Sequence, residues 1–219
     1  MVCIETGWCT RFRRRGGQWF APRDLQSAYR APSLFAQQMV RNGALHHLVT
    51  CDEDFDPTGS WCPFRSITYL CSHGRLVDGA YRLSIHDRDI DLRGIRAEIV
   101  VIDACDVIDQ HPAASWLNQL HPYVRIVLGF QGRATNDPGS ALRGRVFADL
   151  LLAGDPVGDA WINAVTQTAH FGPYGPYDNP AVIAIGDTTA EAKHIAWAAD
   201  IDEVLRLGPR GAHAVAEIR

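Results

Sequence analysis

Two stretches of sequence decide the fold: Ile67-Thr68-Tyr69-Leu70-Cys71-Ser72-His73-Gly74 and Ala97-Glu98-Ile99-Val100-Val101-Ile102-Asp103-Ala104-Cys105. Each contains a short apolar run, which favours a buried strand. The first run closes on His73-Gly74 and the second on Ala104-Cys105. In open α/β sheets, functional side chains lie at the carboxyl ends of the strands. We therefore expect the His73 imidazole and the Cys105 thiol to meet there, as a base and a nucleophile.

Outside these two runs, strand-like and helix-like segments alternate along the chain. Strands are expected at 2–8, 44–50, 124–128 and 182–186, with a hairpin at 79–92. Helices are expected at 23–42, 112–120, 140–153, 157–168 and 188–199, followed by a polar tail. The loop 171–180 is too rich in Gly and Pro for a regular element. The alternation predicts an α/β fold, a three-layer αβα sandwich with a mostly parallel central sheet.

Length and composition point to an ordinary globular protein. The 219 residues fit a single domain, 1–219, and 47% of them are hydrophobic and 21% charged. A net charge of -4 gives no overall attraction to nucleic acid or to anionic lipid. No apolar stretch reaches the roughly 18 residues of a transmembrane helix. The sequence therefore predicts neither a nucleic-acid partner nor a membrane partner.

Six cysteines stand at positions 3, 9, 51, 62, 71 and 105. The amino terminus lacks the apolar core of a signal peptide, so we expect a cytoplasmic protein with reduced thiols. The cysteines and the pair His46-His47 do not have the close spacing of a structural zinc site. No metal is therefore expected.

A thiol beside an imidazole has a defined chemistry. The thiolate attacks a carbonyl carbon, and the imidazole first accepts the thiol proton and later returns it to the leaving amine. The carbonyl oxygen then carries a negative charge that backbone N–H groups stabilise. Gly74 suits this task, because without a Cβ it lets the backbone approach the substrate closely. This chemistry requires no cofactor.

A strand that ends in His-Gly, followed further along by a strand that ends in Ala-Cys, resembles the pattern of the caspase-like cysteine peptidases. This group includes caspases, metacaspases, legumains, gingipains, clostripain and separases. The segment 123–165, with Leu152-Ala153-Gly154-Asp155-Pro156 between two helices, looks like the carboxyl-terminal half of bacterial CHAT-type caspase-like domains. The resemblance covers about residues 65–190.

The resemblance implies roles for individual residues. His73 would be the general base and acid, and Cys105 the nucleophile. The N–H groups of Gly74 and Cys105 would form the oxyanion hole. Family enzymes read the substrate side chain with the residue two positions before the nucleophile, which here is Asp103.

The resemblance also implies a substrate preference. A carboxylate in a specificity pocket would pair with a cationic side chain, and metacaspases and clostripain, which resemble this chain in having Asp at that place, cleave after basic residues. Candidates for the opposite wall of the pocket stand at the end of the next strand: Gly129, Phe130 and Gln131.

The leading hypothesis is thus a cysteine endopeptidase that forms an acyl-enzyme and cleaves a peptide or protein after Arg or Lys. One alternative is a peptide ligase or cyclase, which passes the same acyl group to an amine. Another is a non-catalytic caspase-like binding module with the loop 171–180 as its contact surface. Asp106 departs from the small residue that many family members place after the nucleophile, and would oppose thiolate formation if it pointed inward.

Overall fold

The structure, a computed structural model, describes most of the chain. The described residues are 2–10, 14–15, 18–19, 25, 28–48, 66–77, 80–85, 88–105, 107–108, 113–135, 139–169, 171–172, 175–176 and 178–218.

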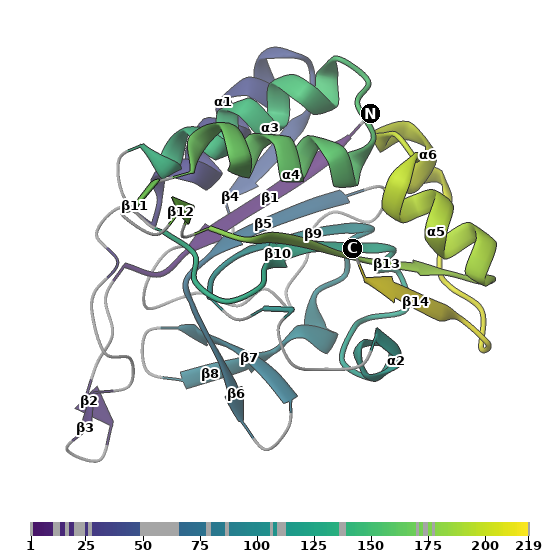
Figure 1. The fold of residues 1–219 in the computed structure, drawn as a ribbon, viewed down its shortest axis with the longest axis horizontal. Coiled ribbons are helices and arrows are strands. Elements are labelled where there is room, and N and C mark those ends of the chain that lie inside the picture. Colours follow the sequence, from purple (N-terminus) through teal and green to yellow (C-terminus); the bar gives the residue numbers. More distant parts are fainter. Residues whose placement is uncertain are drawn as a thin grey trace.

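A seven-stranded sheet runs through the middle of the molecule (Figure 1) in the order β14-β13-β10-β9-β5-β1-β4. Its strands are β1 (Cys3–Trp8), β4 (Leu45–Leu48), β5 (Ser66–Cys71), β9 (Ile99–Asp103), β10 (Ile126–Phe130), β13 (Pro180–Gly186) and β14 (Val215–Ile218). The five strands from β4 to β10 pair in parallel, whereas β13 and β14 pair antiparallel. The predicted α/β class with a mostly parallel central sheet is confirmed.

The central strands are apolar because both faces of the sheet are covered. In β9, Ile99 and Val101 belong to one buried cluster, and Val100 and Ile102 belong to a second. Successive side chains of a strand point to opposite faces, so the two clusters lie on the two sides of the sheet. This double burial produces the continuous apolar runs from which the strands were predicted.

Three helices cover one face of the sheet (Figure 1): α1 (Arg30–Arg41), α3 (Arg143–Leu152) and α4 (Val157–Thr168). Their large side chains Phe35, Phe147 and Trp161 are fully buried, and Phe147 contacts both of the others. Phe35 and Trp161 also contact Tyr69 of β5. Toward the end of the chain, α5 (Thr189–Trp197) packs on β13 and β14, and α6 (Ile201–Arg206) follows it.

The other face carries a small antiparallel sheet, built from β6 (His73–Val77), β7 (Ala80–Ile85) and β8 (Arg88–Asp91), together with α2 (Ala113–Trp116) (Figure 1). Tyr81 and Leu83 of β7 are buried in the cluster on this face, and Tyr81 contacts Trp116 of α2. The remaining short elements are β2 (Arg14–Arg15), β3 (Gln18–Trp19), β11 (Phe171–Gly172), β12 (Gly175–Pro176) and the 3₁₀ helices η3 (Leu92–Gly94) and η4 (Ser140–Leu142).

The structure differs from the sequence-based predictions in several places, and the helix expected at 112–120 is only the four-residue α2. The helix expected from residue 23 begins at Arg30, because Pro32 fits the first turn of a helix but not its interior. The polar tail contains α6 and β14, and β14 extends the central sheet. The loop 171–180 contains the antiparallel pair β11 and β12.

Candidate active site

The two strand-end pairs lie at the same edge of the sheet. β5 and β9 are parallel neighbours, with Cys71 opposite Asp103. His73 and Cys105 each follow this aligned pair by two residues. Just beyond the strands, the Ser72 N–H donates to the Asp103 carbonyl oxygen at 3.4 Å. The structure therefore brings the segment of His73 and the segment of Cys105 together at the carboxyl ends of β5 and β9.

Gly74 lies directly against the backbone of Cys105. A Cβ on Gly74 would be 2.6 Å from the Cys105 carbonyl oxygen and 1.8 Å from the hydroxyl oxygen of Tyr81. The Tyr81 hydroxyl donates to the same carbonyl oxygen at 3.4 Å. A side chain at position 74 would collide with both groups, so this close approach requires a glycine.

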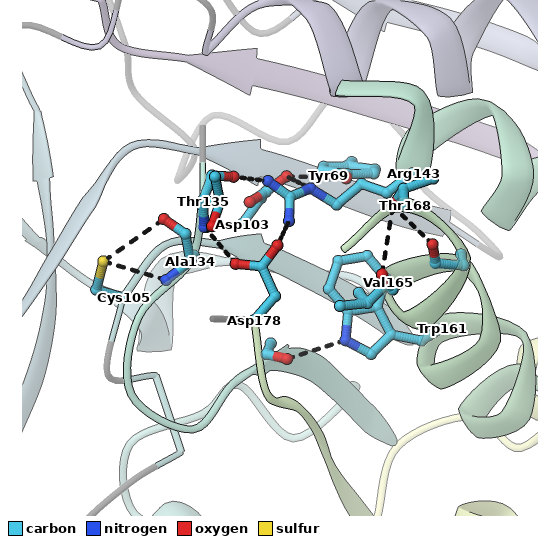
Figure 2. Close-up of polar contacts among 12 residues, drawn as sticks. Tyr69, Asp103, Cys105, Ala134, Thr135, Arg143, Trp161, Val165, Thr168 and Asp178 are labelled. Atoms are coloured by element: carbon cyan, nitrogen blue, oxygen red, sulfur yellow. Dashed lines mark hydrogen bonds and ion pairs between the residues drawn. The ribbon is translucent and has the colours of Figure 1, made fainter. Parts of the chain in front are cut away.

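The Cys105 side chain is half-buried and contacts the loop residue Ala134 (Figure 2). The Ala134 N–H donates to Sγ at 3.4 Å, and the Ala134 carbonyl oxygen lies 3.9 Å from Sγ as an acceptor for the thiol. A backbone donor at a cysteine sulfur favours the charged form of the thiol, and partial exposure allows a reagent to reach it. Cys9 and Cys71, in contrast, are buried cysteines that form no disulfide.

Asp103 points away from the thiol, into a buried ion-pair network on the helical face (Figure 2). The Arg143 guanidinium lies 3.0 Å from Oδ2 of Asp103, and both side chains are 2% exposed. The Tyr69 hydroxyl donates to the same oxygen at 3.1 Å. The carboxylate of Asp103 thus already holds a guanidinium from its own chain.

A second carboxylate, Asp178, completes the network. Its Oδ2 accepts from Arg143 at 3.3 Å, and its Oδ1 accepts from the Thr135 N–H at 2.5 Å. Arg143 also donates to the Thr135 carbonyl oxygen. Buried ion pairs are tolerated when further hydrogen bonds satisfy the charged groups, and the Thr135 backbone and the Tyr69 hydroxyl provide these bonds.

Burial sets the protonation behaviour of this network. It raises the pKa of the Asp103 carboxyl above its usual range, and the Arg143 guanidinium offsets only part of this rise. Burial alone would lower the pKa of Arg143, but the surrounding acidic groups, led by Asp103, raise it overall. Burial also raises the pKa of Tyr69 well above its usual value, so the phenol stays protonated as a donor to Asp103.

The three candidates for a pocket wall have different surroundings. Gly129 is buried in β10, and its carbonyl oxygen accepts from Trp161 Nε1 at 2.9 Å. The Phe130 side chain is also fully buried and lies under the Arg143 guanidinium, 5.1 Å from the ring centre. Gln131 is exposed, and its Oε1 accepts from the side-chain amide of Asn179 at 3.2 Å. Of the three, only Gln131 presents its side chain to solvent.

Sequence reasoning missed Arg143, Asp178, Thr135 and Ala134. Arg143 gave one signal: it is the first residue of α3, and the positive end of a helix dipole disfavours a cation. An arginine at the first position of a helix therefore indicates a nearby acidic partner. The loop residues carried no signal, because their roles depend on backbone groups and on contacts between distant parts of the chain.

The structure also bears on the predictions about Asp106, metal ligands, the state of the cysteines and membrane helices. Asp106 lies outside the described residues. Among the described residues, no three His, Cys, Asp or Glu side chains gather as metal ligands. Cys3 is disulfide-bonded, so the expectation of reduced thiols is wrong at that position. In the described ranges, no helix is both long and apolar enough to cross a membrane.

Comparison with known proteins supports the fold. No family model matches the chain, and neither does any curated protein. Solved structures do match, among them the Drosophila initiator caspase Dronc, with a TM-score of 0.54 and 10% sequence identity. That match covers 83% of this chain and 78% of the Dronc chain. The fold is therefore caspase-like, and the narrower resemblance to CHAT-type domains stays a prediction.

Proposed function

We propose that this chain is a cysteine peptidase in which Cys105 is the nucleophile and His73 is the general base and acid. The observation that carries the proposal is the alignment of β5 with β9, with Gly74 packed against the Cys105 carbonyl. The half-buried state of both the His73 and the Cys105 side chain also supports it, because a substrate must reach both. The caspase-like fold is consistent with the same chemistry.

In the proposed reaction, His73 accepts the thiol proton and the Cys105 sulfur forms a bond to the substrate carbonyl carbon. The N–H groups of Gly74 and Cys105 stabilise the negative charge that develops on the carbonyl oxygen. His73 then gives the proton to the leaving amine as the C–N bond breaks. In the second half, His73 takes a proton from water, whose oxygen attacks the acyl carbon. The C–S bond then breaks, and His73 returns the proton to the Cys105 sulfur as the carboxylic acid product leaves.

Cleavage after Arg or Lys is a separate proposal, because it depends on Asp103. The Asp103 carboxylate is chemically suited to a cation, and its contact with Arg143 illustrates this. A substrate guanidinium would have to displace that of Arg143 to reach it. Peptides that differ only in the residue before the scissile bond, Arg or Lys against Gln, Ala or Asp, measure the preference directly.

The first prediction is that Cys105→Ala and His73→Ala each lower peptide cleavage by at least about a thousandfold without unfolding the protein. The controls are Cys9→Ala, at a buried cysteine, and His46→Ala, in the edge strand β4, where the imidazole contacts Thr6. Both controls should cleave at close to the wild-type rate. Mass spectrometry of the products separates hydrolysis from transfer to an added amine. Full activity in either Cys105→Ala or His73→Ala would refute the proposed dyad.

A further inference from the structure

One loop segment connects the proposed nucleophile to the buried ion pairs. Ala134 contacts the Cys105 sulfur, and the next residue, Thr135, contacts both Asp178 and Arg143 (Figure 2). Arg143 in turn pairs with Asp103, two residues before the nucleophile. The contacts therefore lead from Cys105 back to Asp103, both in the segment at the carboxyl end of β9.

We infer that Asp103, Arg143 and Asp178 are positioning residues, which hold the Ala134–Thr135 segment so that the Ala134 N–H faces the Cys105 sulfur and favours its thiolate form. That this arrangement serves catalysis rests on the proposed function. Its effect on the ionisation of the Cys105 thiol can be measured without a substrate.

The hydrogen bonds show how the segment is held. Both backbone groups of Thr135 form hydrogen bonds with the network. The N–H donates to Asp178 at 2.5 Å, and the carbonyl oxygen accepts from Arg143. Each belongs to a different peptide plane, so two consecutive planes are fixed. The Thr135 N–H shares its plane with the Ala134 carbonyl, and the two groups point in opposite directions because the peptide is trans. Asp178 therefore also sets the direction of the Ala134 carbonyl.

The two Ala134 groups have opposite effects on the thiol. The N–H donor favours the thiolate, whereas the carbonyl oxygen favours the neutral thiol, to which it is an acceptor. The donor is closer to the sulfur, at 3.4 Å against 3.9 Å, so its effect is the larger one. The Ala134 N–H lies in the peptide plane just before the two fixed ones, so the network positions it through the Ala134 Cα. A donor that is already positioned need not reorient when the thiolate forms, and this makes it more effective than a mobile one.

The network is buried, and each of its three charged side chains has an oppositely charged partner. The side chains of Asp103, Arg143 and Asp178 are each at most 2% exposed. Phe130 lies under the guanidinium and Tyr69 donates to Asp103, which leaves Arg143 little freedom to move. This environment suits a fixed support for the Ala134–Thr135 segment.

The experiment measures how fast iodoacetamide alkylates Cys105 as a function of pH, with the modified residue identified by peptide mapping. In Asp178→Ala, we expect the half-maximal rate to shift to higher pH and the rate at pH 7 to fall roughly three- to tenfold. Asp178→Asn keeps an oxygen that accepts from Thr135, so it should stay within about twofold of wild type. A normal titration in Asp178→Ala would overturn the inference.

A matched control separates this effect from a general loss of stability. Asp187→Ala removes a carboxylate from another buried arginine, Arg125, at the opposite end of β10. It should destabilise the protein without moving the alkylation profile of Cys105. An equal shift in Asp187→Ala would show that Asp178 acts only through stability, and would overturn the inference.

A second measurement needs no variant of the network and so remains decisive if Asp178→Ala does not fold. In ¹⁵N-labelled protein, the Ala134 amide resonance should titrate with the Cys105 thiol and should lose this titration in Cys105→Ser. An Ala134 amide that is insensitive to the thiol would contradict the inference. An inactive protein with the predicted thiol titration would instead count against the peptidase proposal alone.

Discussion

Gly74 carries the tightest backbone contact of the candidate site. We predict that Gly74→Ala lowers peptide cleavage by about a hundredfold or more, because its Cβ would push the strand away from Cys105 and displace a proposed oxyanion donor. Gly211→Ala is the control, since its nearest neighbour would be 3.4 Å away, an ordinary contact. Equal cleavage by Gly74→Ala and wild type in a steady-state assay would contradict the proposed oxyanion hole.

Single residues also show what the sequence could reveal of the site. His73, Gly74, Asp103 and Cys105 were proposed as site residues because each stands at the end of an apolar run, which marks the edge of a sheet in the sequence. Their partners were not found, because Arg143 contacts Asp103 from a different element, and such contacts exist only after folding. The same limit explains why the contact of the Asp103 carboxylate with Arg143 was not predicted.

At the scale of elements, the first residue of α3 links that helix to β9. We predict that Arg143→Met lowers the free energy of unfolding by about 3–5 kcal/mol, because it leaves two buried carboxylates without their cation. Arg145→Met, in the same helix, removes an exposed ion pair with Asp149. This variant should change the free energy of unfolding by about 1 kcal/mol or less. Urea denaturation measures both, and similar losses in the two variants would contradict the structural role of Arg143.

The elements differ in how far the sequence predicted them. The central strands β5, β9 and β10 were predicted well, because burial on both faces leaves a continuous apolar run. The start of α1 was placed too early, although Pro32 marked it. The short helix α6 was missed despite a readable signal, the capping box formed by Asp200 and Glu203. β14 is only four residues long and becomes a strand by pairing with β13.

At the scale of the whole molecule, the central sheet joins both ends of the chain, since β1 and β14 belong to it. The apolar clusters on its two faces are built from the same strands. We therefore predict that residues 1–219 unfold as one domain, in a single cooperative transition. Thermal curves followed by far-ultraviolet circular dichroism and by tryptophan fluorescence should coincide. Two separate transitions would contradict the single-domain assignment.

We propose that the caspase-like fold of this chain brings a reactive cysteine, Cys105, together with a histidine base, His73. The most direct measurement is covalent labelling by a peptide acyloxymethyl ketone, read by intact mass and peptide mapping in wild type and in His73→Ala. The account predicts a single label on Cys105 in wild type, formed at least about a hundredfold more slowly in His73→Ala. A label on another cysteine, or the same rate of labelling at Cys105 without His73, would contradict it.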